Sequence, residues 1–132
     1  MVKTAVLGFA HGHINGIANE WIKHPEYGVE LASGWDADEK RRKAACESLK
    51  IPECAALGDI LNDKTVEAVI IGSETLYHSE LAVKAADAGK KIILYKPCAL
   101  TLSQADDIVK AVEQIGRASF IRKIASYIYS TY

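Results

Sequence analysis

The chain has 132 residues, 49% of them hydrophobic and 25% charged, and its 16 basic and 17 acidic residues give a formal net charge of -1. These fractions are typical of one ordinary globular domain that can bury a core without disulfides or metals. The balanced charge lacks the basic excess of a nucleic-acid-binding protein, so we expect no nucleic-acid partner. Residues 1–10 do not have the pattern of a signal peptide, and no run of about 18 apolar residues predicts a membrane span.

The three cysteines, Cys46, Cys54 and Cys98, form neither a C-x-x-C pair nor an even disulfide framework. This usage fits a reducing cytoplasm better than secretion, so we expect a cytoplasmic protein. We expect the cysteines themselves to be small buried apolar side chains.

The hydrophobic period switches along the chain between short β-branched runs and longer helical patterns. This alternation predicts βα units and a parallel sheet. Strands are expected at 2–7, 29–35, 66–71 and 91–95, with short ones at 54–56 and 118–121. Helices are expected from Ile14 until His24-Pro25 stops the first one, at 38–49, at 77–88 and from Thr101 or Ser103 to 115, with one helical turn at 59–62.

These elements predict an α/β fold, a doubly wound parallel sheet of Rossmann type with strand order 3-2-1-4-5-6. We expect a single dinucleotide-binding domain over residues 1–116, followed by a final strand and an aromatic tail over 117–132. The spacing of Ile121, Ile124 and Ile128 suits one face of a helix, but an extended segment fits equally well. The tail either covers its own domain or forms a surface for a homo-oligomer.

In such a sheet, the turn after the first strand faces the ligand, because the next helix points free N–H groups at any phosphate there. The turn here reads Gly8, Phe9, Ala10, His11, Gly12, His13. Only its first glycine matches the dinucleotide fingerprint G-x-G-x-x-G in register. By itself, this turn fits a tight strand-to-helix connection as well as it fits a phosphate site.

Asp36 ends the second strand, a little over 20 residues beyond the turn, as expected for the acid that binds the ribose hydroxyls. A carboxylate there repels a 2'-phosphate, which favours NAD over NADP; capping of the next helix is the alternative role. Arg41 and Arg42 could stack on adenine or screen a phosphate, although we expect them to lie on a solvated helix face. His11 and His13 lack the accompanying ligands of a metal site, so no metal is expected.

Over residues 2 to about 116, the chain resembles the Gfo/Idh/MocA oxidoreductases, named for glucose-fructose oxidoreductase and inositol dehydrogenase. The resemblance rests on the first turn, on Asp36, and on the segment from Val66 to Val109. Within that segment, the family's N-x-x-H pattern appears as residues 75–78 (TLYH) and its E-K-P motif as residues 95–97 (YKP).

The resemblance implies a role for several residues. Lys96, the E-K-P lysine, would lie beside the nicotinamide and the reacting carbon and assist proton transfer, and Pro97 would fix its turn. His78 would lie near the cofactor, with helix capping or packing as the alternative, and Gly72 and Ser73 would let the dinucleotide pass over the sheet edge. The chain departs from the pattern at Tyr95 for glutamate, Thr75 for asparagine and Glu74 for a usual proline.

Members of this family also have a second α/β domain that carries substrate and catalytic residues, which these 132 residues do not contain. We therefore expect the NAD(P)-binding domain of an oxidoreductase that acts, when complete, on a sugar, a polyol or a related hydroxyl compound. A module that binds NAD or coenzyme A without catalysis is the alternative, and a decayed fragment without a ligand is a third. Whether the chain is a truncated product or a separately expressed domain stays open.

Overall fold

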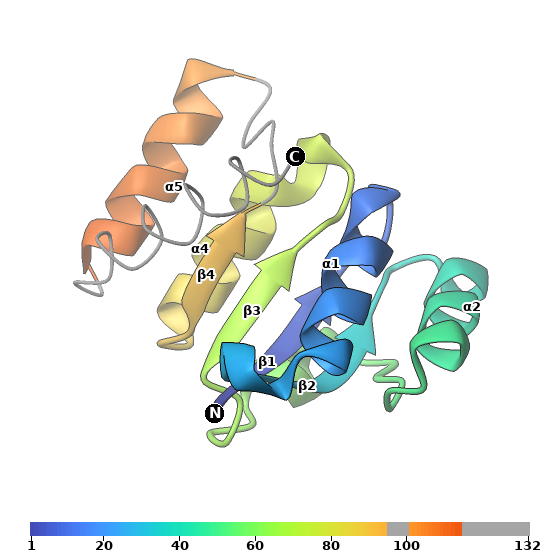
Figure 1. Ribbon diagram of the computed structural model, residues 1–132. Coiled ribbons are helices and arrows are strands. Elements are labelled where there is room, and N and C mark those ends of the chain that lie inside the picture. Colours follow the sequence, from blue (N-terminus) through green and yellow to red (C-terminus); the bar gives the residue numbers. More distant parts are fainter. Residues whose placement is uncertain (95–100, 115–132) are drawn as a thin grey trace.

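The computed structural model describes residues 1–94 and 101–114. Four strands form one parallel sheet: β1 (Val2–Leu7), β2 (Val29–Trp35), β3 (Ala68–Ile71) and β4 (Lys91–Leu94). Their order in the sheet is β2-β1-β3-β4 (Figure 1). The chain therefore extends the sheet from β1 toward β2 and then returns to the other side of β1 to place β3. This reversal confirms the doubly wound Rossmann fold predicted from the sequence.

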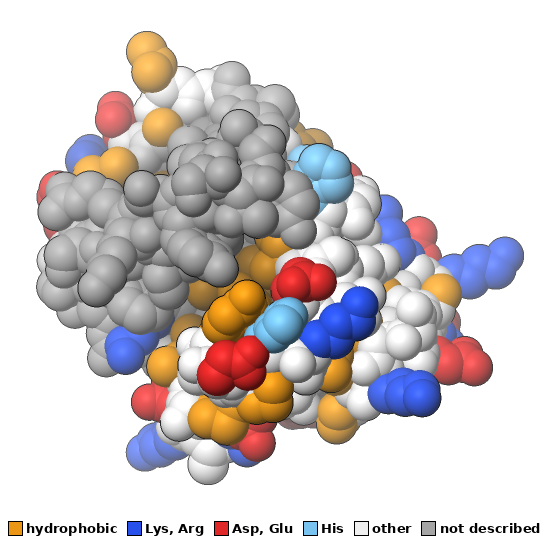
Figure 2. All heavy atoms as spheres, viewed as in Figure 1, with side chains coloured by type: hydrophobic (Ala, Val, Ile, Leu, Met, Phe, Trp, Pro, Cys, Tyr) orange, Lys and Arg blue, Asp and Glu red, His pale blue; other side chains and the backbone are white. Residues whose placement is uncertain are grey.

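Helices follow the strands in the alternating order that the sequence predicts. They are α1 (His13–Lys23), α2 (Glu39–Leu49), α3 (Leu57–Leu61), α4 (His78–Asp87) and α5 (Leu102–Gln114), with short 3-10 turns η1 (Pro25–Tyr27) and η2 (Thr75–Tyr77). Among the described residues, no helix combines the length and apolar character needed to cross a membrane. On the face shown in Figure 2, acidic and basic side chains of the described residues are interspersed.

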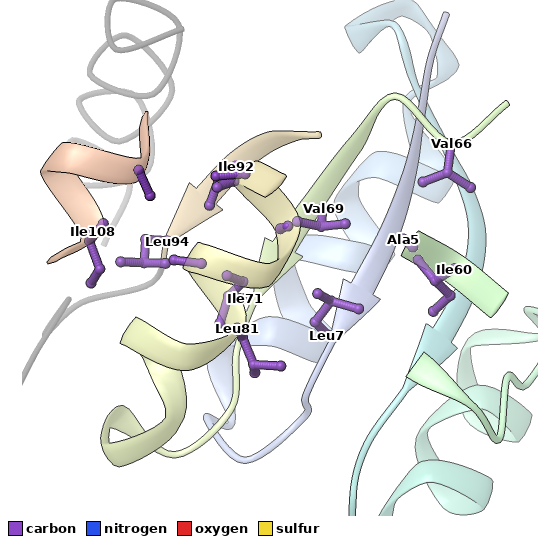
Figure 3. Close-up of a cluster of buried hydrophobic side chains, with 14 residues drawn as sticks. Ala5, Leu7, Ile60, Val66, Val69, Ile71, Leu81, Ile92, Leu94 and Ile108 are labelled. Atoms are coloured by element: carbon purple, nitrogen blue, oxygen red, sulfur yellow. The ribbon is translucent and has the colours of Figure 1, made fainter. Parts of the chain in front are cut away.

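The helices cover both faces of the sheet. On one face, Val6 of β1, Ile70 of β3 and Ile93 of β4 pack with the apolar sides of α1 and α2. The alternate strand residues, such as Leu7 and Ile71, point to the other face, where they pack with α3, α4 and α5 (Figure 3). Successive side chains of a strand point to opposite faces, so near-continuous apolar runs such as AVII are what a sheet buried on both sides requires.

Local signals set the helix ends. The side chain of Asp38 accepts a hydrogen bond of 3.0 Å from the Arg41 amide and caps α2. Thr101, rather than Ser103, caps α5, because its Oγ1 accepts from the amide of Gln104 at 3.1 Å. The first helix stops before His24-Pro25, as predicted.

The expected third strand at 54–56 is wrong. The structure has only an isolated parallel bridge there, between Gly34 of β2 and Glu53. The Gly34 amide donates to the Pro52 carbonyl at 3.0 Å, and the Cys54 amide donates to the Gly34 carbonyl at 2.9 Å. Pro52 has no amide proton to extend a ladder, so the segment touches the sheet beside β2 without becoming a strand. The expected sixth strand at 118–121 lies outside the described residues.

The cysteines differ from one another. Cys46 is buried in the core between α2 and the sheet, as predicted, and is a free thiol. Burial raises the pKa of the Cys46 thiol to about 11, so it stays protonated. Cys54 is a free, partly buried thiol, and Cys98 lies outside the described residues.

Candidate dinucleotide site

Three segments that are distant in sequence meet at the carboxyl edge of the sheet: the loop after β1, the residue after β2 and the residues after β3. Backbone hydrogen bonds join them. The Gly8 amide donates to the Trp35 carbonyl at 2.7 Å, the Gly72 amide donates to the Leu7 carbonyl at 3.0 Å, and the His11 amide donates to the Gly72 carbonyl at 3.2 Å. The site residues predicted from the first turn, from Asp36 and from Gly72-Ser73 are therefore brought together.

Gly8 and Gly72 allow this close contact. Gly8 has a φ of +97°, and a Cβ placed on it would lie 2.5 Å from the Ser73 amide nitrogen. A Cβ on Gly72 would lie 2.3 Å from Cγ1 of Ile14 and 2.7 Å from the Gly8 carbonyl oxygen. Both glycines are thus explained by packing within the chain, between the loop and the end of β3.

Gly12 is different, because the space beside it is open. A Cβ on Gly12 would meet nothing within 4 Å, and its φ of -59° is ordinary. Gly12 precedes the first turn of α1, where no side chain caps the helix. The exposed residues Gly12 and His13, with partly exposed Ala10 and His11, leave this end of the helix accessible.

Phe9 is turned into the protein. Its side chain is buried, and its ring lies so close to Gly34 that a Cβ there would be 2.7 Å from Phe9 Cζ. The Phe9 amide donates to Oδ2 of Asp36 at 2.9 Å. Phe9 therefore connects the first turn to the acid at the end of β2.

Asp36 is 1% exposed, and the chain itself supplies hydrogen bonds to both of its carboxylate oxygens. Oδ2 accepts from the Phe9 amide and from Nε of Arg41 at 2.7 Å, and Oδ1 accepts from the Asp38 amide at 2.8 Å and from Nη2 of Arg41 at 2.9 Å. Burial by itself would raise the pKa of Asp36, but the hydrogen bonds from Arg41, Phe9 and Asp38 outweigh it and hold the pKa below its usual value. Asp36 is accordingly a carboxylate, held in a bidentate pair with Arg41.

The expectation that Arg41 and Arg42 lie on a solvated helix face is wrong. Arg41 crosses the site, and its Nη2 also donates to Oε1 of Glu74 at 2.9 Å. Arg42 is buried: its Nε donates to Glu53 at 2.8 Å and its Nη1 to the Asp36 carbonyl at 3.2 Å. Glu39 and Lys43 do lie on the solvated face of α2, as predicted, and their charged atoms are 2.9 Å apart.

A pocket of about 680 Å³ opens between these segments. Gly8, Asp36 and Ser73 contribute to its lining from the ends of three strands, and Trp35, Leu57, Tyr77 and Leu81 give it apolar surface. The charged residues around it are Asp36, Asp38, Arg41, Glu74, Glu80 and Lys84. This volume and mixed lining are those of a small-molecule or cofactor site. A second hollow, of about 470 Å³, lies at the opposite edge of the sheet around Lys64, Gly89 and Lys91.

His78 is completely buried at the start of α4. Its Nε2 lies 2.9 Å from the Ser73 carbonyl oxygen, which can only accept, so Nε2 carries the proton. The ring of His11 meets the ring of His78 edge-on, with centroids 5.7 Å apart. Burial, followed by the neighbouring His78, lowers the pKa of His11, and Glu74 opposes this shift. His78 thus holds the turn after β3, which is the packing role expected as the alternative to a position near the cofactor.

Lys96 and Pro97 lie outside the described residues. Within residues 1–94 and 101–114, no group of three His, Cys, Asp or Glu side chains gathers where a metal ion could bind.

Comparison with known proteins decides the family. Residues 2–122 match the model of the Gfo/Idh/MocA oxidoreductase family, described as having an NAD-binding Rossmann fold. The chain belongs to this family. It is 30% identical over 92 residues to the inositol 2-dehydrogenase of Salmonella typhimurium and 35% identical over 68 residues to the scyllo-inositol 2-dehydrogenase (NAD(+)) of Bacillus subtilis. These matches cover 68% and 49% of this chain, and 27% and 20% of the two relatives.

Solved structures share the fold of this family member. The WlbA dehydrogenase of Bordetella pertussis, in complex with NADH and UDP-GlcNAcA, superposes with a TM-score of 0.77 at 20% identity, covering 87% of this chain and 35% of that one. The biliverdin reductase of Synechocystis sp. PCC 6803, in complex with biliverdin and NADP+, has a TM-score of 0.74 at 20% identity, with the same shares covered. The chain thus spans about a third or less of the length of these proteins, and their cofactors include both NADH and NADP+.

Sequence reasoning missed most of the pocket wall. The charge pattern predicts a solvated position for Arg41, although its place five residues after Asp36, one helical turn into α2, indicates that it could return to that carboxylate. Leu57, Tyr77, Glu80 and Lys84 were not predicted as lining residues. They come from α3, η2 and α4, and only the packing of these elements on the sheet brings them to Asp36.

Proposed function

We propose that this chain is the dinucleotide-binding part of an NAD-dependent oxidoreductase that acts on a sugar, a polyol or a related hydroxyl compound. The observation that carries the proposal is the position of the pocket. It lies at the carboxyl ends of β1, β2 and β3, where the strand order reverses on either side of β1. Open α/β sheets bind their ligands at this switch point. Family membership and the inositol dehydrogenase relatives support the same reaction class.

The described residues fit a dinucleotide. The apolar side chains Trp35, Leu57 and Tyr77 offer surface for the adenine, and the uncapped start of α1 beside Gly12 offers amides and open space for the pyrophosphate. Asp36 is the proposed ribose acid. Since Arg41 and two amides occupy its oxygens, Arg41 must give up a bond before a hydroxyl can bind there.

Bound NAD would supply the hydride acceptor for oxidation of the carbon that carries the substrate hydroxyl. The role proposed for Lys96 is to orient that hydroxyl and to assist its proton transfer. The neutral amine would take up the proton, and the ammonium so formed would stabilise the negative charge that develops on the oxygen. His78 keeps the turn after β3 in place through the Ser73 carbonyl. The proposed location is the reducing cytoplasm, which suits the free thiols of Cys46 and Cys54.

Fluorescence titration tests the proposal, because Trp35 lines the pocket and NADH quenches a nearby indole. We expect NADH to quench the tryptophan fluorescence in a saturable way. Added NAD should displace NADH and reduce this quenching. The variant Gly12→Asp should weaken NADH binding by roughly tenfold or more, since its carboxylate would face the pyrophosphate, while the helix start tolerates or gains from the negative charge. Asn19→Asp, an exposed position further along α1, is the matched control.

The proposal is rejected if NADH causes no saturable change up to millimolar concentration. It is also rejected if Gly12→Asp and Asn19→Asp bind NADH equally well, because the loop would then not contact the pyrophosphate.

A further inference from the structure

Arg41 joins two carboxylates that come from different parts of the chain. Through Nε and Nη2 it pairs with Asp36, at the end of β2, and through Nη2 it also pairs with Glu74, in the turn after β3. The side chain of Arg41 is 33% exposed and lines the pocket. The guanidinium is therefore part of the pocket wall, and its position depends on both acids.

The two acids contribute differently. Asp36 is buried and accepts four hydrogen bonds from three residues, so it is part of the framework around β1 and β2. The Glu74 side chain is 49% exposed and contacts Arg41 across the mouth of the pocket. Removing the charge of Glu74 would thus release one bond of Arg41 and leave the buried network in place.

Charge at this position matters for one chemical feature, the 2'-phosphate that distinguishes NADP from NAD. An arginine near the end of the second strand is the usual partner of that phosphate. Here the guanidinium is neutralised by two carboxylates, and Asp38 adds further negative charge to the lining, while Glu80 is paired with Lys84 at 3.0 Å. A phosphate with about two negative charges would meet repulsion, and among the described residues that line the pocket it would find no guanidinium free of a carboxylate partner.

We propose that Glu74 is a specificity-determining residue, which excludes NADP by holding Arg41 against Asp36 and by placing a second carboxylate at the mouth of the pocket. This inference rests on the proposed dinucleotide site. It adds that the preference for NAD depends on a residue after β3, as well as on the acid after β2.

The test compares dissociation constants of NADH and NADPH for the 132-residue chain and for Glu74→Gln, by calorimetry at fixed salt. We expect NADPH affinity to rise roughly five- to tenfold in Glu74→Gln, because one negative charge near the phosphate is removed and Arg41 is released. NADH affinity should change less than NADPH affinity, because NADH carries no phosphate at that position. Glu74→Asp keeps the charge and should keep the preference, which a purely structural role would not require.

Glu39→Gln is the control for net charge. Glu39 lies on the same helix as Arg41 but pairs with Lys43 at the surface, so its removal should leave the NADH/NADPH ratio unchanged. If the wild-type chain binds NADH and Glu74→Gln leaves the ratio unchanged, or changes it no more than Glu39→Gln does, the specificity role is overturned and the dinucleotide site stands. If the wild-type chain binds neither nucleotide, the proposed function fails and the specificity role fails with it.

Discussion

Replacement of Gly8 by alanine should strongly destabilise the protein. The new Cβ would lie 2.5 Å from the nitrogen, 2.6 Å from Cα and 2.7 Å from Cβ of Ser73. Two of these three neighbours are backbone atoms, so no side-chain rotation can relieve the contact. The φ of +97° adds about 1–2 kcal/mol for an L-residue, and overpacking of this kind costs about 1–3 kcal/mol.

Together these effects predict a loss of about 2–5 kcal/mol in the free energy of unfolding, a large part of the stability of a typical domain. For a chain of this size, the melting temperature should fall by about 6–20 °C. Gly12→Ala is the matched control, since its Cβ would meet nothing within 4 Å. Gly12→Ala should lower the free energy of unfolding by less than about 0.5 kcal/mol.

Urea and thermal unfolding of the two variants provide the assay. A free energy of unfolding for Gly8→Ala within about 1 kcal/mol of the wild type, or equal losses for the two glycine variants, would rule out this steric role of Gly8. Either result would mean that the end of β1 does not press on Ser73 as the structure shows.

Two further predictions concern buried charges. Nζ of Lys90 donates to the carbonyls of Asp63 and Val66 at 2.6 and 2.7 Å, and Lys90→Met leaves both carbonyls without that donor. In urea titrations, the variant should therefore lose about 2–3 kcal/mol in the free energy of unfolding, and an unchanged unfolding midpoint would contradict this. For Asp36, the folded-state pKa lies below that of the unfolded chain, so its pair with Arg41 stabilises the protein fully above about pH 4, and this stability is lost as the pH falls further. Melting curves should therefore show the wild type losing its advantage over Asp36→Asn below about pH 4, and a constant difference down to pH 2 would disprove the assignment.

The parts of the fold that were predictable are those with local causes. The apolar run AVII of β3, the His24-Pro25 stop after α1 and a cap for α5 at Thr101 or Ser103, of which the structure selects Thr101, are each determined by a few neighbouring residues. The expected third strand is wrong because a short segment next to Pro52 becomes a strand only if it forms a ladder with the neighbouring strand. In the described residues, this segment forms one isolated bridge to β2, between Gly34 and Glu53.

The site was predictable only in outline. Chain order placed Gly8, Asp36 and Ser73 at one edge, because the carboxyl ends of parallel strands lie together. The pairing of Arg41 with Glu74, 33 residues further along the chain, leaves no mark in local spacing. Local spacing also does not show why residue 72 is a glycine. The reason is the close approach of Ile14, which belongs to a different element, α1.

The central claim is that the edge of the sheet formed by β1, β2 and β3 binds an adenine dinucleotide. Amide chemical-shift mapping of the isotopically labelled chain with NADH tests it most directly. We expect saturable shifts of the amide signals of Gly8, Gly12 and Ser73, with the amides of Lys64 and Lys91 at the opposite hollow unaffected. Shifts confined to that opposite hollow, or no shifts at millimolar NADH, would contradict it.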